Sequence, residues 1–516
     1  MKIRMIVLMA VVLAGALQGK AAAGAEHRRI GWHDCRTGPD DETGQRLADA
    51  GASCGEVTVP LDYADPGGRT LSVAVARRAA TDPAHRLGTL VVNIGGPGPS
   101  REGVALLAQG LPPEVPSGAQ SIAARYDLVG VDPRFFGLSA PLECGWPTGK
   151  YLRSAQVAGP DRVSFDRGAA VAKDLAARCA DRGDVLPYAS TRDMARDMDL
   201  VRAALGEQKI SYLGWSFGSY LGAVHLQLFP RRVDRIVLDS PAAPEATGPA
   251  LTRETGPADA AALRDWASWA ARRDERYHLG ATAADVLAAV DRIARAAARE
   301  PLRVGGHRID AAMIPGLLLT VDDSDAFYAE FSAQVVVLRD AARVLVVTPT
   351  PAQEWKLSLY DDPKVEPAFG FSATIANQCA DRAASRDPET YYRDIQAHRA
   401  AEPLFGPLAR DITPCAFWPV SPAEPPTVIG NDRPALIVGA SGDPVTPYPG
   451  QRSLHRALTG SRMVTLDGAF RHGVYLFARD SCVTGAVESY LLGGSLPGAD
   501  VTCASQRSPG RTTPAS

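Results

Sequence analysis

The segment that most constrains the fold is a Gly-x-Ser-x-Gly motif, which runs from Gly214 to Gly218 and has Ser216 at its centre. It ends an apolar run at 209–214 that is typical of a buried strand, and it leads into 220–229, whose apolar spacing indicates a helix. A sharp turn from strand to helix lifts the central serine clear of a sheet, and the flanking glycines let neighbouring backbone approach. In this context the motif predicts Ser216 as a nucleophile.

A serine nucleophile of this kind also needs donors for the developing oxyanion. The N–H of Phe217 follows the serine at the start of the predicted helix, where negative charge is favoured. A second glycine-rich turn at 93–98 follows another predicted strand, and the N–H of Gly95 or Gly96 is expected to donate there. A phosphate loop is disfavoured, because no Gly-Lys-Ser or Gly-Lys-Thr follows the turn.

The candidate acid and base follow the serine along the chain. A serine hydroxyl needs a neighbouring base, and the base needs a carboxylate that holds its tautomer. Asp443 follows the predicted strand 434–440, and His472 follows the predicted strand 462–466. The order serine, acid, histidine is the one expected around a strand–turn–helix nucleophile. We therefore predict a triad of Ser216, Asp443 and His472.

Four other residues compete for the two supporting roles. His455 lies in the predicted helix 451–458, and His225 lies more than two helical turns beyond the serine on the serine's own helix. Asp239 ends a predicted strand and is the serious rival acid, since some members of this fold place the acid there. Asp467 is expected to be a turn residue.

The wider pattern indicates an α/β chain. Short β-branched runs bounded by turns alternate with helix-like stretches, which predicts a mostly parallel sheet covered by helices. Together with the nucleophile motif, this pattern predicts an α/β-hydrolase fold with an eight-stranded sheet. Asp-Pro-Gly-Gly at 65–68 favours an antiparallel hairpin between the first two strands. The predicted strands are 56–60, 71–77, 89–94, 126–131, 209–214, 235–239, 434–440 and 462–466.

The strand pattern stops between residues 241 and 432, where stretches such as 258–273 show helical spacing of apolar residues. We interpret this segment as a helical cap inserted over the carboxyl edge of the sheet, where ligands of α/β proteins bind. The hydrolase core then comprises residues 26–240 and 433–505. The polar tail, residues 506–516, is expected to be disordered.

The N-terminus has the layout of a secretory signal. Lys2 and Arg4 precede an apolar run at 5–17, and small residues follow at 21–25. The run is too short to span a membrane, and no later apolar run is long enough. Residues 1–25 are therefore predicted to be a signal peptide, and the mature protein is predicted to be secreted, extracellular and free of the membrane.

The cysteines agree with export. Their count of eight is even, which favours disulfides in an exported chain, and none forms a Cys-x-x-Cys pair, which disfavours zinc. Pairing in chain order is preferred, although the sequence leaves other pairings open. No metal or other cofactor is expected. The cysteines in order are Cys35, Cys54, Cys144, Cys179, Cys379, Cys415, Cys482 and Cys503.

The charge balance bears on partners. The formal net charge is -3, from 55 basic and 58 acidic residues, and no Lys/Arg run could follow a phosphate backbone. Nucleic acid is therefore an unexpected partner. We expect a monomer that acts on a peptide or on an acylated small molecule.

The sequence resembles the secreted actinobacterial tripeptidyl aminopeptidase family and, more distantly, the prolyl aminopeptidases. The resemblance covers nearly the whole mature chain, and it implies a secreted, metal-free α/β-hydrolase that releases short peptides from free N-termini. It also assigns the family's nucleophile, acid and base to Ser216, Asp443 and His472. The matching segments are 57–63, 95–98, 130–134, 214–220, 237–239, 442–447 and 482–503.

Three places in the sequence depart from the family's pattern. Pro-Ser-Arg-Glu at 99–102 replaces the usual continuation of the glycine-rich loop, Phe135 and Phe136 stand where a glycine is usual, and Arg471 replaces the glycine before the histidine. These changes alter pocket walls and leave the triad intact. The resemblance also extends to extracellular enzymes that deacylate aminoacyl compounds such as N-acetylpuromycin. An amidase, deacetylase or esterase for an N-acylated small molecule, such as an acetylated antibiotic, is therefore the alternative.

A free-amine substrate would need a carboxylate in the cap that pairs with its ammonium group. The sequence offers several acidic residues there, although for any one of them an ordinary solvated helix surface is the simpler interpretation. A third hypothesis, an inactive binding protein, predicts a missing triad member, and none is missing. The acidic candidates are Glu245, Glu254, Asp322, Asp323, Asp325 and Glu330.

Overall fold

The computed structural model describes residues 30–112, 115–146, 158–360 and 370–505, so the predicted signal peptide and the predicted tail lie outside the described residues. Its centre is a nine-stranded sheet in the order β1-β2-β4-β3-β5-β6-β9-β10-β11. Strand β2 is antiparallel to β1 and β4, and the other neighbours are parallel. The strands are β1 (Ser53–Pro60), β2 (Thr70–Arg78), β3 (Gly88–Asn93), β4 (Tyr126–Val131), β5 (Ile210–Trp215), β6 (Val233–Asp239), β9 (Ala435–Ala440), β10 (Ser461–Asp467) and β11 (Val501–Ala504).

The predicted α/β-hydrolase architecture is confirmed, with one correction to the sheet. All eight predicted strands are present, and the first two form the expected antiparallel hairpin. The ninth strand, β11, was not predicted. It has four residues and pairs with the edge of β10, where Cys503 ties it to helix α19 (Ser481–Gly493) by a disulfide with Cys482.

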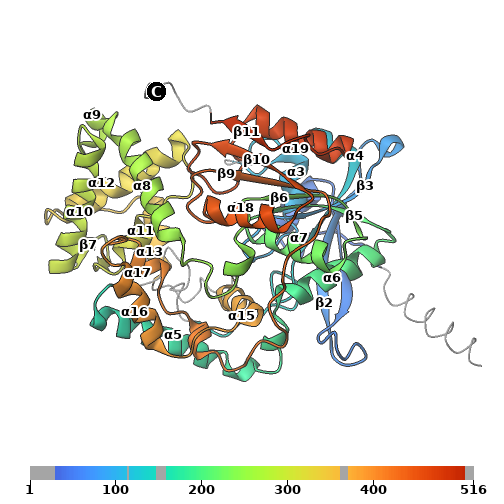
Figure 1. Cartoon of the computed structure of the whole chain (residues 1–516), viewed down its shortest axis with the longest axis horizontal. Helices are drawn as coiled ribbons and strands as arrows, with labels where there is room; N and C mark the ends of the chain where they lie inside the picture. The colour runs from blue at the N-terminus through green and yellow to red at the C-terminus, as the bar shows by residue number, and fades with distance from the viewer. Residues whose placement is uncertain (1–29, 113–114, 147–157, 361–369, 506–516) are drawn as a thin grey trace, which may run out of the picture.

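Helices cover both faces of the sheet (Figure 1). Side chains alternate between the two faces, so that in β3 Val91 joins one apolar core while Leu90 and Val92 join the other. The first core lies under α6 (Thr191–Ala204), α7 (Phe217–Leu228) and α18 (Tyr448–Ala457). The second lies under α2 (Glu42–Asp49), α3 (Gly103–Gln109), α4 (Gln120–Arg125) and α19.

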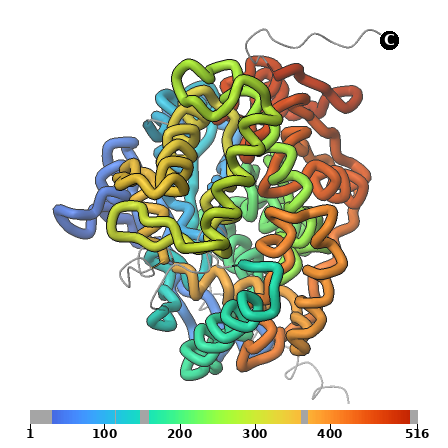
Figure 2. Tube along the Cα trace, turned by 90° about the vertical axis from the view of Figure 1, so that its left-hand side faces the viewer, coloured from blue at the N-terminus to red at the C-terminus, as the bar shows by residue number. Residues whose placement is uncertain are grey.

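Between β6 and β9 the chain forms a mainly helical insertion, which faces the viewer in Figure 2. It has an apolar core of its own, in which the rings of Trp266 and Phe331 meet edge to face at 4.8 Å. A short hairpin, β7 (Leu302–Val304) with β8 (His307–Ile309), shows that strand structure does not stop entirely here. The described helices are α8 (Thr255–Ala271), α9 (Asp274–Tyr277), α10 (Ala283–Arg299), α11 (Ile314–Leu317), α12 (Asp325–Ala341), α13 (Pro351–Ser358), α15 (Phe371–Asp381), α16 (Pro388–His398) and α17 (Gly406–Ala409).

The eight cysteines form the four disulfides of the preferred pairing, which joins each cysteine to its neighbour in chain order. Such a set is stable only in an oxidising compartment, and it is therefore consistent with secretion. Among the described helices, none combines the length and the apolar character that crossing a bilayer requires.

Candidate active site

The nucleophile motif adopts the sharp turn that the sequence predicts. Ser216 lies between β5 and α7 with φ 54° and ψ −125°, a conformation that costs an ordinary residue about 1–3 kcal/mol. A Cβ on Gly214 would lie 2.4 Å from the carbonyl oxygen of Gly218, and one on Gly218 would lie 2.5 Å from Asn93 Oδ1. The Ser216 N–H donates to the Asp239 carbonyl at 2.9 Å. The two glycines are therefore required by close packing at the turn.

The glycine-rich loop after β3 lies directly against the nucleophile. Gly95 has φ +94°, and a Cβ there would approach Trp215 O to 2.7 Å and Ser216 Cβ to 3.0 Å. Its N–H donates to Asn93 Oδ1 at 2.9 Å and is therefore occupied. Gly96 lines the same pocket as Ser216 and Phe217. Of the two glycines expected to donate to the oxyanion, the structure favours Gly96.

Asp443 and His472 meet at the carboxyl ends of β9 and β10. His472 Nδ1 lies 3.0 Å from Asp443 Oδ2 and 3.2 Å from Oδ1. The carboxylate is buried, and the N–H groups of Val445 and Thr446 donate to Oδ1 at 2.8 and 3.0 Å. The carboxylate is thus held in the loop and directed at the imidazole, the arrangement that orients a catalytic histidine.

Two residues around Asp443 were not singled out from the sequence. Thr446 Oγ1 lies 2.8 Å from Asp443 Oδ2 and 3.3 Å from His472 Nδ1. Gln451, buried on α18, donates through Nε2 to Asp443 Oδ2 at 3.1 Å and to the Thr446 carbonyl at 2.8 Å. A glutamine on the apolar side of an amphipathic helix, soon after the acid, was the available signal for Gln451.

Asp239, the rival acid, supports the histidine loop by accepting hydrogen bonds from backbone N–H groups of that loop. Its buried carboxylate accepts the N–H groups of Val474 and Tyr475 at 3.0 and 2.7 Å and the Ser240 hydroxyl at 2.8 Å. Burial raises the pKa of Asp239 to about 6, although these hydrogen bonds oppose the shift. Because its bonds go to the backbone after His472 and not to the imidazole, the structure favours Asp443 as the acid.

The three remaining competitors for the roles of acid and base make other contacts. His455 Nδ1 lies 2.7 Å from the Ser461 hydroxyl, on the outer side of α18. His225 is buried in α7 with its ring 5.3 Å from that of Phe229. Asp467 accepts the hydroxyl of Ser441 at 2.9 Å and so joins the acid loop to the histidine loop.

Electrostatics around the candidate base favour its protonated form. Burial lowers the pKa of His472, but the carboxylates of Asp443 and, to a smaller extent, Asp239 outweigh burial and raise it above its usual value. The Ser216 hydroxyl is not hydrogen-bonded to His472 within the described residues. Both adjoin Thr446, which lines the Ser216 pocket and contacts the imidazole. Catalytic contacts of this kind often tighten only when substrate binds.

The insertion holds the histidine loop from the other side. His472 N–H donates to the Val321 carbonyl at 2.9 Å. Arg471, which is almost fully buried, pairs with Asp322 at 3.1 Å and with Asp323 at 3.5 Å. The position of the candidate base is therefore fixed partly by a segment of the insertion.

A pocket opens beside the nucleophile. Its lining includes Ser216, Phe217, Gly96, Tyr220, Leu251 and Asp381. None of the six acidic candidates from the sequence is among the pocket's lining residues. Three of them are exposed, and the others make hydrogen bonds or ion pairs elsewhere. Those six are Glu245, Glu254, Asp322, Asp323, Asp325 and Glu330.

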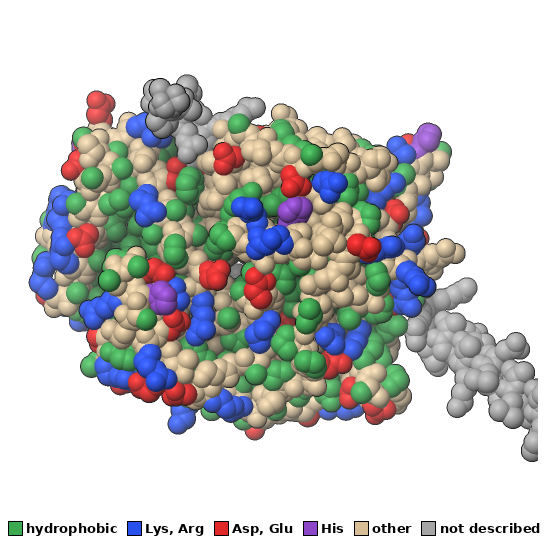
Figure 3. Space-filling view, in the orientation of Figure 1, with side chains coloured by type: hydrophobic (Ala, Val, Ile, Leu, Met, Phe, Trp, Pro, Cys, Tyr) green, Lys and Arg blue, Asp and Glu red, His purple; other side chains and the backbone are tan. Residues whose placement is uncertain are grey.

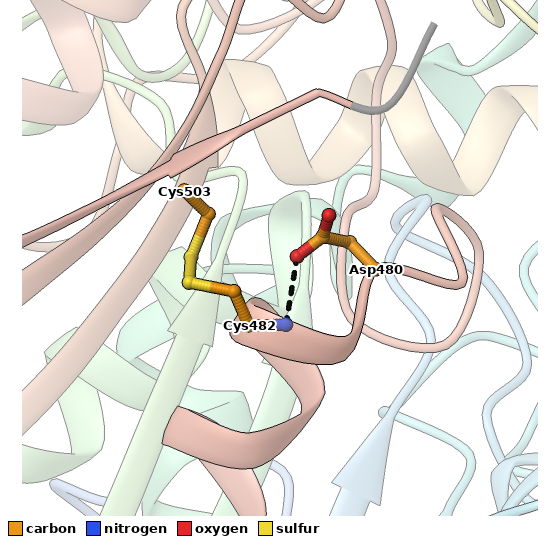
Figure 4. Close-up of side chains that lie close together, drawn as sticks. All are labelled: Asp480, Cys482 and Cys503. Carbon is orange, nitrogen blue, oxygen red and sulfur yellow. Dashed lines mark hydrogen bonds between the residues drawn. A yellow bond between two sulfur atoms is a disulfide. The ribbon is translucent and has the colours of Figure 1, made fainter.

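Two further features bear on metals and nucleic acid. The group Asp480, Cys482 and Cys503 has metal-ligating atoms close together, but the two sulfurs form a disulfide and Asp480 accepts the Cys482 N–H as a helix cap (Figure 4). Thiolates bind metal, and disulfide sulfurs do not supply them.

On the face drawn in Figure 3, acidic and basic side chains are interspersed, without a stripe of one sign.

Comparisons with known proteins agree with the α/β-hydrolase fold. A family model described as alpha/beta hydrolase fold matches residues 88–309, and one described as TAP-like protein matches residues 402–503. A tripeptidyl aminopeptidase of Streptomyces coelicolor is 33% identical over 508 residues, which cover 95% of this chain and 88% of that protein.

Two mycobacterial relatives are similar over comparable lengths. A serine protease of Mycobacterium tuberculosis is 28% identical over 528 residues, which cover 96% of each chain. A protein of the same organism named carboxylesterase B is 30% identical over 492 residues, which cover 92% of this chain and 89% of that protein.

Proposed function

The chain belongs to the tripeptidyl aminopeptidase family of α/β hydrolases, and we propose that it is a secreted aminopeptidase that releases short peptides, of the tripeptidyl type, from free N-termini. The chain is a serine hydrolase of a peptidase family. Release of tripeptides from free N-termini is supported by the tripeptidyl aminopeptidase relative and by the arrangement of Ser216, Asp443 and His472.

The observation that carries the proposal is the buried Asp443 carboxylate, which bonds the half-buried His472 near the strained Ser216 turn. In the proposed mechanism His472 Nε2 takes the hydroxyl proton as Ser216 Oγ attacks the scissile carbonyl. The N–H groups of Phe217 and Gly96 stabilise the oxyanion. His472 then gives its proton to the leaving amine, and a water molecule, activated by the same histidine, releases the acyl group from Ser216.

Asp443 has two roles in this mechanism. It holds the Nδ1–H tautomer of His472, so that Nε2 carries the lone pair that accepts the serine proton. It also stabilises the imidazolium that forms during attack, which agrees with the raised pKa of His472. The donors from Val445, Thr446 and Gln451 hold the carboxylate in position while this charge forms.

A second candidate function is an amidase, deacetylase or esterase that acts on an N-acylated small molecule. The similarity to carboxylesterase B favours it, and esters and amides pass through the same acyl-enzyme. The two functions differ in the acyl group that the pocket beside Ser216 accepts.

Hydrolysis of matched substrates by the purified secreted protein separates the two functions. The substrates are a tripeptide anilide with a free N-terminus, its N-acetyl form, an N-acetyl-aminoacyl amide and an aryl acetate. The aminopeptidase proposal expects anilide release only from the free-amine peptide, and no release by Ser216→Ala. Removal of acetyl groups without anilide release would overturn the proposal in favour of the deacylase.

A further inference from the structure

Asp381 is a carboxylate that no part of the proposed mechanism uses. It ends α15, a helix whose other residues are mostly buried, and it is itself half-buried. It lines the pocket that also contains Ser216 and the two proposed oxyanion donors, Phe217 and Gly96. One pocket is therefore lined by both the proposed nucleophile and a carboxylate.

The carboxylate is anchored on its side away from the pocket. The N–H and the hydroxyl of Thr191, at the first turn of α6, donate to Oδ1 and Oδ2, each at 2.6 Å. A carboxylate has about four acceptor positions, so each oxygen retains one. In the described parts of the chain no arginine or lysine forms an ion pair with Asp381, and the adjacent Arg382 donates instead to the Thr247 carbonyl at 3.1 Å.

The surroundings leave this carboxylate short of positive charge. Burial raises the pKa of Asp381 to about 7, the bonds from Thr191 oppose the shift, Asp193 on α6 adds to it, and Arg382 lowers it. Tyr220 of α7 lines the same pocket, and burial together with the Asp381 carboxylate raises the pKa of Tyr220 to about 12. A cation that entered the pocket would be bound most strongly by the ionised carboxylate.

We propose that Asp381 is a specificity residue that binds an ammonium group of the substrate in the pocket beside Ser216. The inference rests on the proposed peptidase function and names the chemistry that its acyl side accepts. The ammonium has two sources, the free N-terminus of the peptide or the side chain of a lysine next to the scissile bond. Both supply the same group, and substrates distinguish them.

The test compares Asp381→Asn with the wild type on four substrates. Asparagine retains an oxygen for the Thr191 N–H, and its amide can donate to the Thr191 hydroxyl. The substrates are Ala-Ala-Ala-p-nitroanilide, its N-acetyl form, N-acetyl-Ala-Ala-Lys-p-nitroanilide and p-nitrophenyl acetate. Asp161→Asn is the matched control, since Asp161 accepts Ser164 N–H and hydroxyl at a helix N-terminus outside the pocket.

The expected result is a loss confined to substrates with the recognised ammonium. Removing a charged partner should lower their kcat/KM about 10- to 100-fold, with p-nitrophenyl acetate hydrolysis lowered far less. Loss for Ala-Ala-Ala-p-nitroanilide identifies the N-terminus, and loss for the lysine substrate identifies the side chain. Equal loss on all four substrates, or no loss on any, would overturn the proposal.

A measurement on the wild type keeps the test independent of how the variant folds. n-Butylammonium should inhibit p-nitrophenyl acetate hydrolysis competitively and 1-butanol should not, with weaker inhibition below pH 7, where Asp381 is protonated. Equal inhibition by the two compounds would contradict the inference. This assay needs no peptidase activity, so it separates the two proposals. If the protein cleaves no anilide but is inhibited by the amine, the proposed peptidase function is wrong and the ammonium site is supported.

Discussion

Replacing Asp443 by asparagine tests the assigned acid, because the two side chains have the same shape and differ in one donor group. Every neighbour that bonds the carboxylate acts as a donor. At Oδ1 these are the N–H groups of Val445 and Thr446. At Oδ2 they are Gln451 Nε2, the Thr446 hydroxyl and His472 Nδ1. An asparagine must therefore direct its NH2 group at a donor in either orientation.

The less costly orientation is the one that disturbs His472. An NH2 group at the Oδ1 position would face two backbone N–H groups, which cannot turn away. At the Oδ2 position it would face three groups. Gln451 keeps its bond to the Thr446 carbonyl at 2.8 Å, and the Thr446 hydroxyl can accept while it donates to the Ser240 carbonyl at 2.9 Å. The third group is His472 Nδ1. His472 can accept there only with its proton on Nε2, a tautomer that offers no lone pair to Ser216. We expect kcat to fall about 10,000-fold, or about 5.5 kcal/mol.

Asp239→Asn is the matched comparison. The Asp239 carboxylate bonds the Val474 and Tyr475 N–H groups and not the imidazole. Its replacement should lower the free energy of unfolding by about 1–3 kcal/mol, while kcat falls far less than in Asp443→Asn. The assays are kcat on p-nitrophenyl acetate and on a peptide anilide, with urea unfolding for stability. If Asp239→Asn abolishes hydrolysis while Asp443→Asn retains a tenth of kcat, the acid is Asp239 and the reasoning is wrong.

Three more predictions concern the same site and its support. Gly95→Ala should lower kcat/KM about 100-fold, since its Cβ would press on Trp215 O at 2.7 Å and displace the nucleophile; unchanged kinetics would contradict this packing. The value of kcat/KM should fall tenfold per pH unit below the pKa of His472. That pKa lies above 6.5, because the carboxylates of Asp443 and Asp239 raise it by more than burial lowers it. A midpoint under pH 6 would refute the assignment of His472 as the base. Replacing Cys379 and Cys415 by serine should lower the free energy of unfolding in urea by about 2–4 kcal/mol relative to the disulfide-bonded wild type, and an unchanged value would contradict a stabilising role for this bond.

The central strands could be predicted because each parallel strand is a continuous apolar run between turn residues. β4 was predicted with its observed bounds, Tyr126–Val131. β11 could not be predicted in this way, because it has four residues and is held by β10 and by the Cys482–Cys503 disulfide. The β7–β8 hairpin has three residues per strand, which is too short for an alternating pattern to be recognised.

Topology alone could bring the three predicted triad residues to one edge of the sheet, whereas their surroundings could not be predicted. Ser216, Asp443 and His472 each follow a parallel strand, and parallel strands end at one edge of a sheet. Asp381 and Gln451 reach the site only through the packing of α15 and α18, which no local pattern in the sequence records. The choice between Gly95 and Gly96 depended in the same way on where the side chain of Asn93 points.

The contacts of His472 show that the insertion does more than cover the site. Asp443 holds the imidazole, Asp239 holds the backbone that follows it, and the Val321 carbonyl holds the N–H of His472 itself at 2.9 Å. Arg471 adds an ion pair to the same segment of the insertion. A displacement of that segment would move the base away from Ser216 while the strained serine turn, which is fixed by β5 and α7, stays in place. We therefore expect activity to depend on the packing of the insertion as well as on the sheet.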